Sequence, residues 1–168
     1  EECRHLTGCA AMKFVIRDRV PDMQKKLKRV FKNEIVIGVT EETSSRDGSD
    51  VTNALLAGIH ENGSESGNIP ARPFLGRGIE SVKYDIGLCL AQAIKASLTD
   101  KPFKVWLERA GEIGAEGVQD FIKAGDFVPL KESTLASRRA KGNYSTAPLV
   151  DTGQMFNAIT YDIRKNDD

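Results

Sequence analysis

The sequence contains few of the residues that commonly mark a catalytic or metal site. It has three cysteines and two histidines in 168 residues, and an odd cysteine count completes no disulfide framework. Lys plus Arg and Asp plus Glu number 24 each, so no net charge draws the whole chain to nucleic acid or to an anionic membrane. No apolar run approaches the ~20 residues of a membrane span. The composition therefore predicts a soluble globular protein of mixed α/β content.

The first residues of the chain show no periodicity. Met12 has the position of a natural start, so we expect residues 1–11 to be an unstructured extension and residues 12–168 to form a single α+β domain. Cys3, His5 and Cys9 make only a partial zinc site, because zinc takes four ligands, or three and a water. We therefore expect no metal and no cofactor.

Hydrophobic periodicity divides the rest into helices and a few strands. Short alternating or β-branched runs predict strands at 13–17, 34–40 and 159–165. Apolar spacing of three and four predicts helices at 21–33, 51–63, 78–98 and 102–124, and a short helix within 150–159. Asp50 or Thr52 is the expected cap of the second helix, and Asp151 or Thr152 is the expected cap of the last. Together they predict an α+β fold, in which a small mixed or antiparallel sheet packs against two long helices and an extended loop is braced by prolines.

Three glycines interrupt the second long helix at intervals of three residues. Gly111, Gly114 and Gly117 each cost about 1 kcal/mol relative to alanine in a helix interior. They indicate either a smooth face for close packing against another helix or subunit, or a loosely wound or interrupted helix, and the sequence does not separate the two.

The pair with catalytic potential is His60-Glu61. No second histidine follows at the HExxH spacing of zinc proteases, and the chain has no P-loop, G-x-S-x-G or G-x-G-x-x-G motif. A helix-terminal histidine beside a glycine-rich loop commonly caps a helix or lies in an interface. We expect a protein that is not an enzyme, with a small hydrolase using His60 and Glu61 as the alternative from another class.

Basic residues are concentrated in two places. They outnumber acidic residues between Lys13 and Lys32, and Arg138, Arg139 and Lys141 form a second group. Such side chains on a surface helix are most often only solvated, but local positive charge can also contact phosphates without reading sequence. Arg138, Arg139 and Lys141 are therefore candidates for residues close to DNA.

Four motifs follow one another along the chain. They are ALLAGIHENG, IPARPFLG, FVPLKESTLASRRAKG and APLVDTGQMFNAITYDIR, which lie between residues 54 and 164, with two amphipathic helices between the second and the third. The arrangement resembles the small tail-component proteins of tailed bacteriophages, the tail-completion, tail-terminator or neck proteins between head connector and tail tube. IPARPFL and PLVDTGQM are its most specific pieces. Its motif-loop residues are Pro129, Leu130, Thr134, Arg138, Pro148, Asp151, Thr152 and Gly153.

The resemblance implies a structural virion protein. Such a protein would form a ring, six-fold by analogy, at the head–tail neck, where it terminates or completes the tail tube and joins it to the head connector while leaving a DNA passage. A head-side connector or adaptor is the alternative within the same class. The implied partners are copies of the chain, the tail tube protein, the head connector or adaptor protein and passing DNA, with no membrane. The implied location is the virion, after assembly in the host bacterial cytoplasm.

The segment NIPARPFLG could provide the contact between subunits that such a ring requires. Residues before proline favour extended backbone, so the two prolines stiffen an arm that the loop HENGSESG separates from the preceding helix. The arm could dock on a neighbouring subunit and offer the planar fork of Arg72 to a carboxylate there. Alternatively, it is an internal strap that pins the loop to the helix near Gly78. The candidate interface residues are Ile69, Pro70, Arg72, Pro73, Phe74 and Leu75.

Overall fold

The computed structural model describes residues 18–48 and 50–166. Over this part of the chain the elements are α1 (Val20–Phe31), β1 (Asn33–Val39), α2 (Asn53–Asn62), α3 (Phe74–Leu98), α4 (Lys104–Ala124), α5 (Glu132–Ala140), α6 (Gln154–Asn157) and β2 (Ile159–Lys165). The α+β class is confirmed, with two long helices and two of the expected strands. The expected strand at 13–17 and the extension at 1–11 lie outside the described residues.

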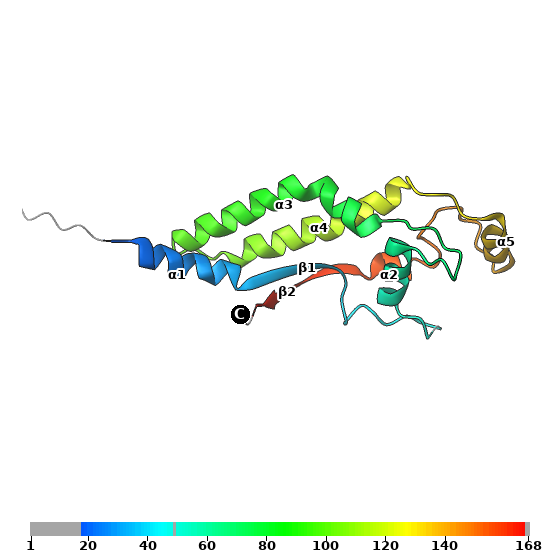
Figure 1. Cartoon of the computed structure of the whole chain (residues 1–168), viewed down its shortest axis with the longest axis horizontal. Coiled ribbons are helices and arrows are strands. Elements are labelled where there is room, and N and C mark those ends of the chain that lie inside the picture. Colours follow the sequence, from blue (N-terminus) through cyan, green and yellow to red (C-terminus); the bar gives the residue numbers. More distant parts are fainter. Residues whose placement is uncertain (1–17, 49, 167–168) are drawn as a thin grey trace, which may run out of the picture.

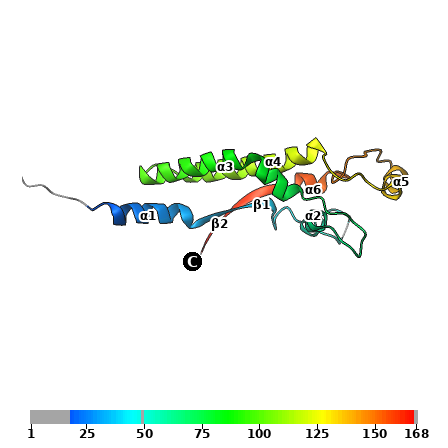
Figure 2. The same ribbon diagram turned by 45° about the horizontal axis from the view of Figure 1, so that its top comes forward.

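The two long helices form one layer and the two strands form the other. α3 and α4 run side by side and are joined by residues 99–103, and the β1–β2 ribbon lies against them (Figures 1 and 2). α1 extends from one end of the ribbon, whereas α2, α5 and α6 gather at the other, which makes the molecule elongated. None of the helices in the described ranges is long and apolar enough to cross a membrane.

The ribbon is antiparallel and carries one apolar face. Its register runs from Asn33 opposite Lys165 to Val39 opposite Ile159 and places Ile37 opposite Tyr161. The alternation expected from the sequence of β2 is confirmed, because Tyr161 is directed at α4. A two-stranded ribbon is marginal by itself, so it depends on the helical layer for stability.

α4 is a continuous helix, and its glycines are buried. A Cβ on Gly111 would collide with the ring of Tyr161, and a Cβ on Gly114 would collide with the end of Ile37. The expectation of a smooth packing face is therefore confirmed, and the alternative of an interrupted helix is wrong. Gly111 and Gly114 therefore allow the ribbon of the same chain to pack closely against α4.

Glycines also set the distance between the two long helices. A Cβ on Gly117 would lie 2.6 Å from Cγ2 of Val82, and a Cβ on Gly78 would lie 2.6 Å from the Cα of Val118. The contact at Gly78 is the more restrictive, because the atom it faces belongs to the backbone of α4. The helices consequently approach backbone to backbone at that point.

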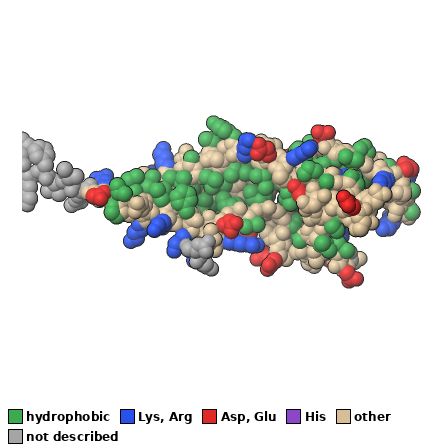
Figure 3. Space-filling view, in the orientation of Figure 1, with side chains coloured by type: hydrophobic (Ala, Val, Ile, Leu, Met, Phe, Trp, Pro, Cys, Tyr) green, Lys and Arg blue, Asp and Glu red, His purple; other side chains and the backbone are tan. Residues whose placement is uncertain are grey.

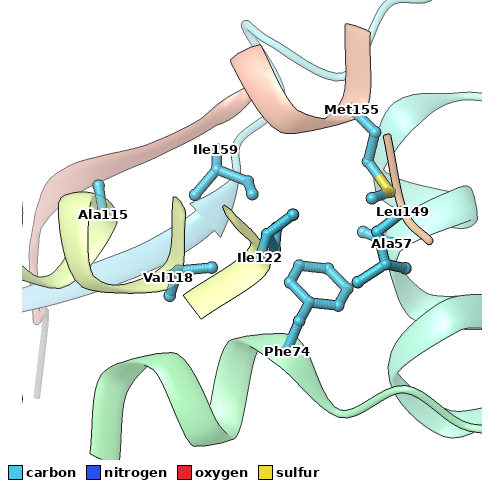
Figure 4. Close-up of a cluster of buried hydrophobic side chains, with 8 residues drawn as sticks. All are labelled: Ala57, Phe74, Ala115, Val118, Ile122, Leu149, Met155 and Ile159. Carbon is cyan, nitrogen blue, oxygen red and sulfur yellow. The ribbon is translucent and has the colours of Figure 1, made fainter. Parts of the chain in front are cut away.

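The buried side chains form two clusters along the helical layer. The larger one joins α2, α3, α4 and the segment that leads into β2, around a fully buried Phe74 (Figure 4). Its buried members are Ala57, Phe74, Ala115, Val118, Ile122, Leu149, Met155 and Ile159. The second cluster fixes α1 to the end of the helical pair and contains Val30, Ala93, Ala96, Phe103 and Leu107.

We expect Gly78→Ala to destabilise the protein by about 1–3 kcal/mol, because its methyl group meets α4 backbone that cannot move aside as a side chain can. Gly87→Ala is the matched control in the same helix, since nothing lies within 4 Å of its Cβ position. There the change should raise stability by about 0.5–1 kcal/mol through helix propensity. Urea denaturation of both variants measures this, and equal effects would contradict the close contact.

Candidate functional site

The sequence motifs meet at the end of the molecule formed by α2, α5 and α6. The glycine-serine loop after α2 closes on itself: Ser64 and Ile69 exchange two backbone hydrogen bonds of 2.9 Å. Gly63 has φ of 78°, and a Cβ there would lie 2.9 Å from the backbone nitrogen of Ala71, so only glycine fits. The proline-braced segment therefore leaves from a closed loop.

Arg72 is directed into the protein. Its side chain is 4% exposed, and its Nε–H donates to the carbonyl oxygen of Val128 at 3.1 Å while Nη2 lies 3.5 Å from that of Pro129. The backbone N–H of Arg72 donates to the carbonyl oxygen of His60 at 2.7 Å. The guanidinium is thus engaged within the chain, which favours the internal strap over a fork held out to a neighbouring subunit.

The end of the expected arm is the beginning of α3. The helix starts at Phe74 rather than near Gly78, so Phe74 and Leu75 belong to its first turn and Phe74 lies in the core. The carboxylate of Glu61 accepts hydrogen bonds from the backbone N–H groups of Leu75 at 2.9 Å and Gly76 at 3.1 Å. Glu61 therefore caps α3 from α2, where a negative charge also complements the helix dipole.

Arg138 joins the two C-terminal motifs. It lies on α5, is 9% exposed, and its Nη1 donates to the carbonyl oxygens of Ser145 at 3.1 Å and Ala147 at 2.9 Å. Its Nε is 3.5 Å from Oδ1 of Asp151, which also accepts a hydrogen bond from Asn143 at 2.7 Å. The arginine of the first motif thus fixes the loop that leads into PLVDTG.

Asp151 and Thr152 do not cap the following helix as expected. α6 covers only Gln154–Asn157, and its N-cap is Gly153 with φ of 79° and no side-chain cap bond. The expected short helix is present, but the Asp151 carboxylate is bound by Asn143 and Arg138 and does not cap it. The Thr52 cap expected for α2 is confirmed, since its hydroxyl accepts the N–H of Leu55.

These residues surround a hollow of about 260 Å³, which we call the motif hollow. Of the expected motif residues, those that line it are Leu130, Thr134, Arg138, Asp151, Thr152 and Gly153. Its polar lining also includes Arg46, His60, Ser137, Lys141 and Gln154. The hollow is basic on balance and carries hydroxyl groups, so it suits a small anionic or hydrogen-bonding group.

His60 faces the motif hollow in its neutral form. Its Nδ1 is buried and has no hydrogen-bond partner among the described residues. Burial, and then the nearby positive charges of Arg72 and Arg138, lower the pKa of His60. Since the Glu61 carboxylate is committed to the first turn of α3, the two neighbours do not share an acid–base geometry. That the protein is not an enzyme stays a prediction.

The candidates for contact with DNA differ in their surroundings. Arg138 is buried and bonded to backbone carbonyls, so sequence reasoning placed it on the surface incorrectly. Arg139 forms an ion pair with Glu132, and Lys141 is exposed beside the motif hollow. Of this group, Lys141 is the side chain best placed to contact a phosphate.

The described part of the chain holds no group of three or more His, Cys, Asp or Glu side chains that could bind a metal ion. The proposed partial set of Cys3, His5 and Cys9 lies outside that part. Searches against protein-family models, curated proteins and solved structures found no match to this chain.

Arg72→Lys should lower the free energy of unfolding by about 1–3 kcal/mol, because an ammonium group cannot reproduce the hydrogen bonds of a guanidinium buried among carbonyls. Arg77→Lys on the exposed face of α3 is the control and should have little effect. Chemical denaturation gives both values. If the strap is the only role of Arg72, self-association should weaken no more than this loss of stability explains; a larger loss would reinstate an interface role.

The neutral state of His60 should make stability depend on pH. Its pKa is lower in the folded chain than the unfolded value of about 6.5, so its contribution is complete above pH ~6.5 and is lost as pH falls below it. As the pH is lowered from 7.5 to 5, the melting temperature should therefore fall more steeply for the wild type than for His60→Gln. Parallel curves for wild type and His60→Gln would refute the expectation.

Proposed function

We propose that this protein is a structural component of a tailed-bacteriophage virion. It forms a ring at the head–tail neck, terminates or completes the tail tube, and joins the tube to the head connector while leaving a passage for DNA. The six-fold subunit number comes from the resemblance described above. The partners are further copies of the chain, the tail tube protein and the head connector protein.

The arrangement of the motifs supports this proposal. The residues that carry the resemblance serve as loop anchors: Arg72 binds the segment after α4, and Arg138 binds the segment before α6. Rigid loops at one end of an elongated body are suited to docking against other proteins, because little conformational entropy is lost when they bind. A purely structural role also accounts for the use of Glu61 as a helix cap.

The observation that carries the proposal is the apolar surface left uncovered on the helices. Large hydrophobic side chains are exposed on α1, α3 and α4, and Figure 3 shows a band of hydrophobic side chains over this part of the molecule. They are Val20, Met23, Phe31, Tyr84, Leu88, Leu90, Val105 and Trp106. Extended apolar patches of this kind mark interaction sites, and contacts between the subunits of a ring would cover them.

Ring formation is the test of this function. Light scattering and electron microscopy of the purified protein should show closed rings with a central opening, and the rings should bind the ends of tail tubes or head connectors. Virions made without the protein should have unjoined heads and tails. A protein that stays monomeric at all concentrations and binds neither tubes nor connectors would refute the proposal.

A further inference from the structure

α1 presents a basic face that the rest of the chain does not neutralise. Lys25, Lys28 and Lys32 are exposed and line a shallow groove along the helix. No hydrogen bond or ion pair engages these three side chains within the described ranges. Phe31, which is 64% exposed, lies beside Lys28 on the helix surface, since they are three residues apart. The free surface of α1 therefore combines an apolar ring with positive charge.

A groove between α3 and α4 has the opposite character. It has a volume of about 420 Å³, with Val82, Leu88 and Ile113 among its apolar lining residues and Asp85 and Glu116 among its acidic ones. Leu88 is 49% exposed. In the described part of the chain, the side-chain carboxylates of Asp85 and Glu116 have no ion-pair or hydrogen-bond partner. We call this surface the acidic groove.

The other charges in the acidic groove are already paired. Arg109 binds Glu112 at 3.0 Å, and Asp120 binds Lys123 at 2.8 Å. Asp85 and Glu116 are therefore the lining carboxylates that form no ion pair of their own within the described ranges. The pKa of Arg109 is raised by its hydrogen bond to Glu112 and also by the charge of Glu116. A ligand that matches this groove carries both apolar side chains and positive charge, which is the composition of the free face of α1.

The groove is out of reach of the α1 of the same chain. Lys26 on α1 binds Asp100 at 2.6 Å, and the hydroxyl of Ser97 donates to the carbonyl oxygen of Lys26 at 2.7 Å. These bonds hold α1 at the C-terminal end of α3. Asp85 precedes Ser97 by twelve residues, which places it about 18 Å further along the helix at 1.5 Å per residue. An α1 that fills the groove must come from another copy.

We propose that the free face of α1 of one copy docks into the acidic groove of a second copy. The contact would place Lys25 and Lys28 beside Asp85 and Glu116, with Phe31 near Leu88. It deepens the proposed ring function and rests on it, since it names the surfaces through which neighbouring subunits meet. Each copy has both surfaces and they differ, so the contact is heterologous and can repeat from copy to copy until a ring closes.

Two complementary variants test the pairing. Lys25→Glu with Lys28→Glu makes α1 acidic like the groove, whereas Asp85→Lys with Glu116→Lys makes the groove basic like α1. Each variant alone should need about tenfold or more protein to associate, because like charges then face each other. In an equimolar mixture every contact between unlike copies is again attractive. The mixture should therefore assemble, with the two variants alternating around the ring.

The control reverses charges on the ribbon side of the molecule. Lys165→Glu with Glu42→Lys alters two exposed residues outside both surfaces and should leave association unchanged. Circular dichroism checks that every variant is folded. As a second measurement on the wild type, raising salt from about 0.05 to about 0.5 M should weaken association, because it screens charges near the surface.

The outcomes separate this contact from the proposed function. If either charge-reversed variant forms rings at wild-type concentration, or if the folded variants fail to assemble when mixed, the α1–groove contact is refuted while the ring function stands. A wild-type protein that never associates and binds no tail component overturns both. Loss of assembly by each variant and its recovery on mixing support the proposed contact.

Discussion

The close approach of α3 to α4 at Gly78 is the constraint on which the remaining architecture depends. With no side chain between the helices there, the backbone of α3 lies against Val118, and Phe74, one turn earlier, is brought fully into the core. The capping bonds from Glu61 then attach α2 to the same end of α3. A larger residue at position 78 would separate the helices and weaken all of these contacts together.

The regular elements could be predicted because burial imposes a period on the sequence. The apolar stripe along α3, the glycine spacing of α4 and the alternation in β2 each indicate which face of the element packs against the rest of the protein. The start of α3 could not be predicted, because its cap is supplied by Glu61 on another helix. Glycine spacing likewise left open whether another helix or subunit packs closely on α4 or the helix is interrupted, and it gave no sign that the ribbon packs there.

The sequence identified which residues form the candidate site but not how their side chains are arranged in space. The sequence singled out Arg72, Arg138 and Asp151, and the structure places Arg138 and Asp151 at one hollow and Arg72 on the adjoining strap. It could not show that the two arginines turn inward, because an exposed arginine and one bonded to carbonyls have the same local pattern. A signal was present in hindsight: the carbonyls that the two arginines bind lie at or beside Pro129 and Pro148, in segments without regular secondary structure, where free carbonyls need donors.

Charge is segregated along the molecule in a way that matters for assembly. Equal numbers of acidic and basic residues give no net charge, and the sequence showed the basic cluster between Lys13 and Lys32 but not the carboxylates in the middle of the helical pair that form no ion pair among the described residues. Because these surfaces are about 18 Å apart along α3, a copy docked by one of them is displaced along its neighbour, and its own groove is left available for the next copy. The rotation at each step then decides whether the series closes, so the shape of the helical pair, through the glycines that fix it, would set the size of the proposed ring.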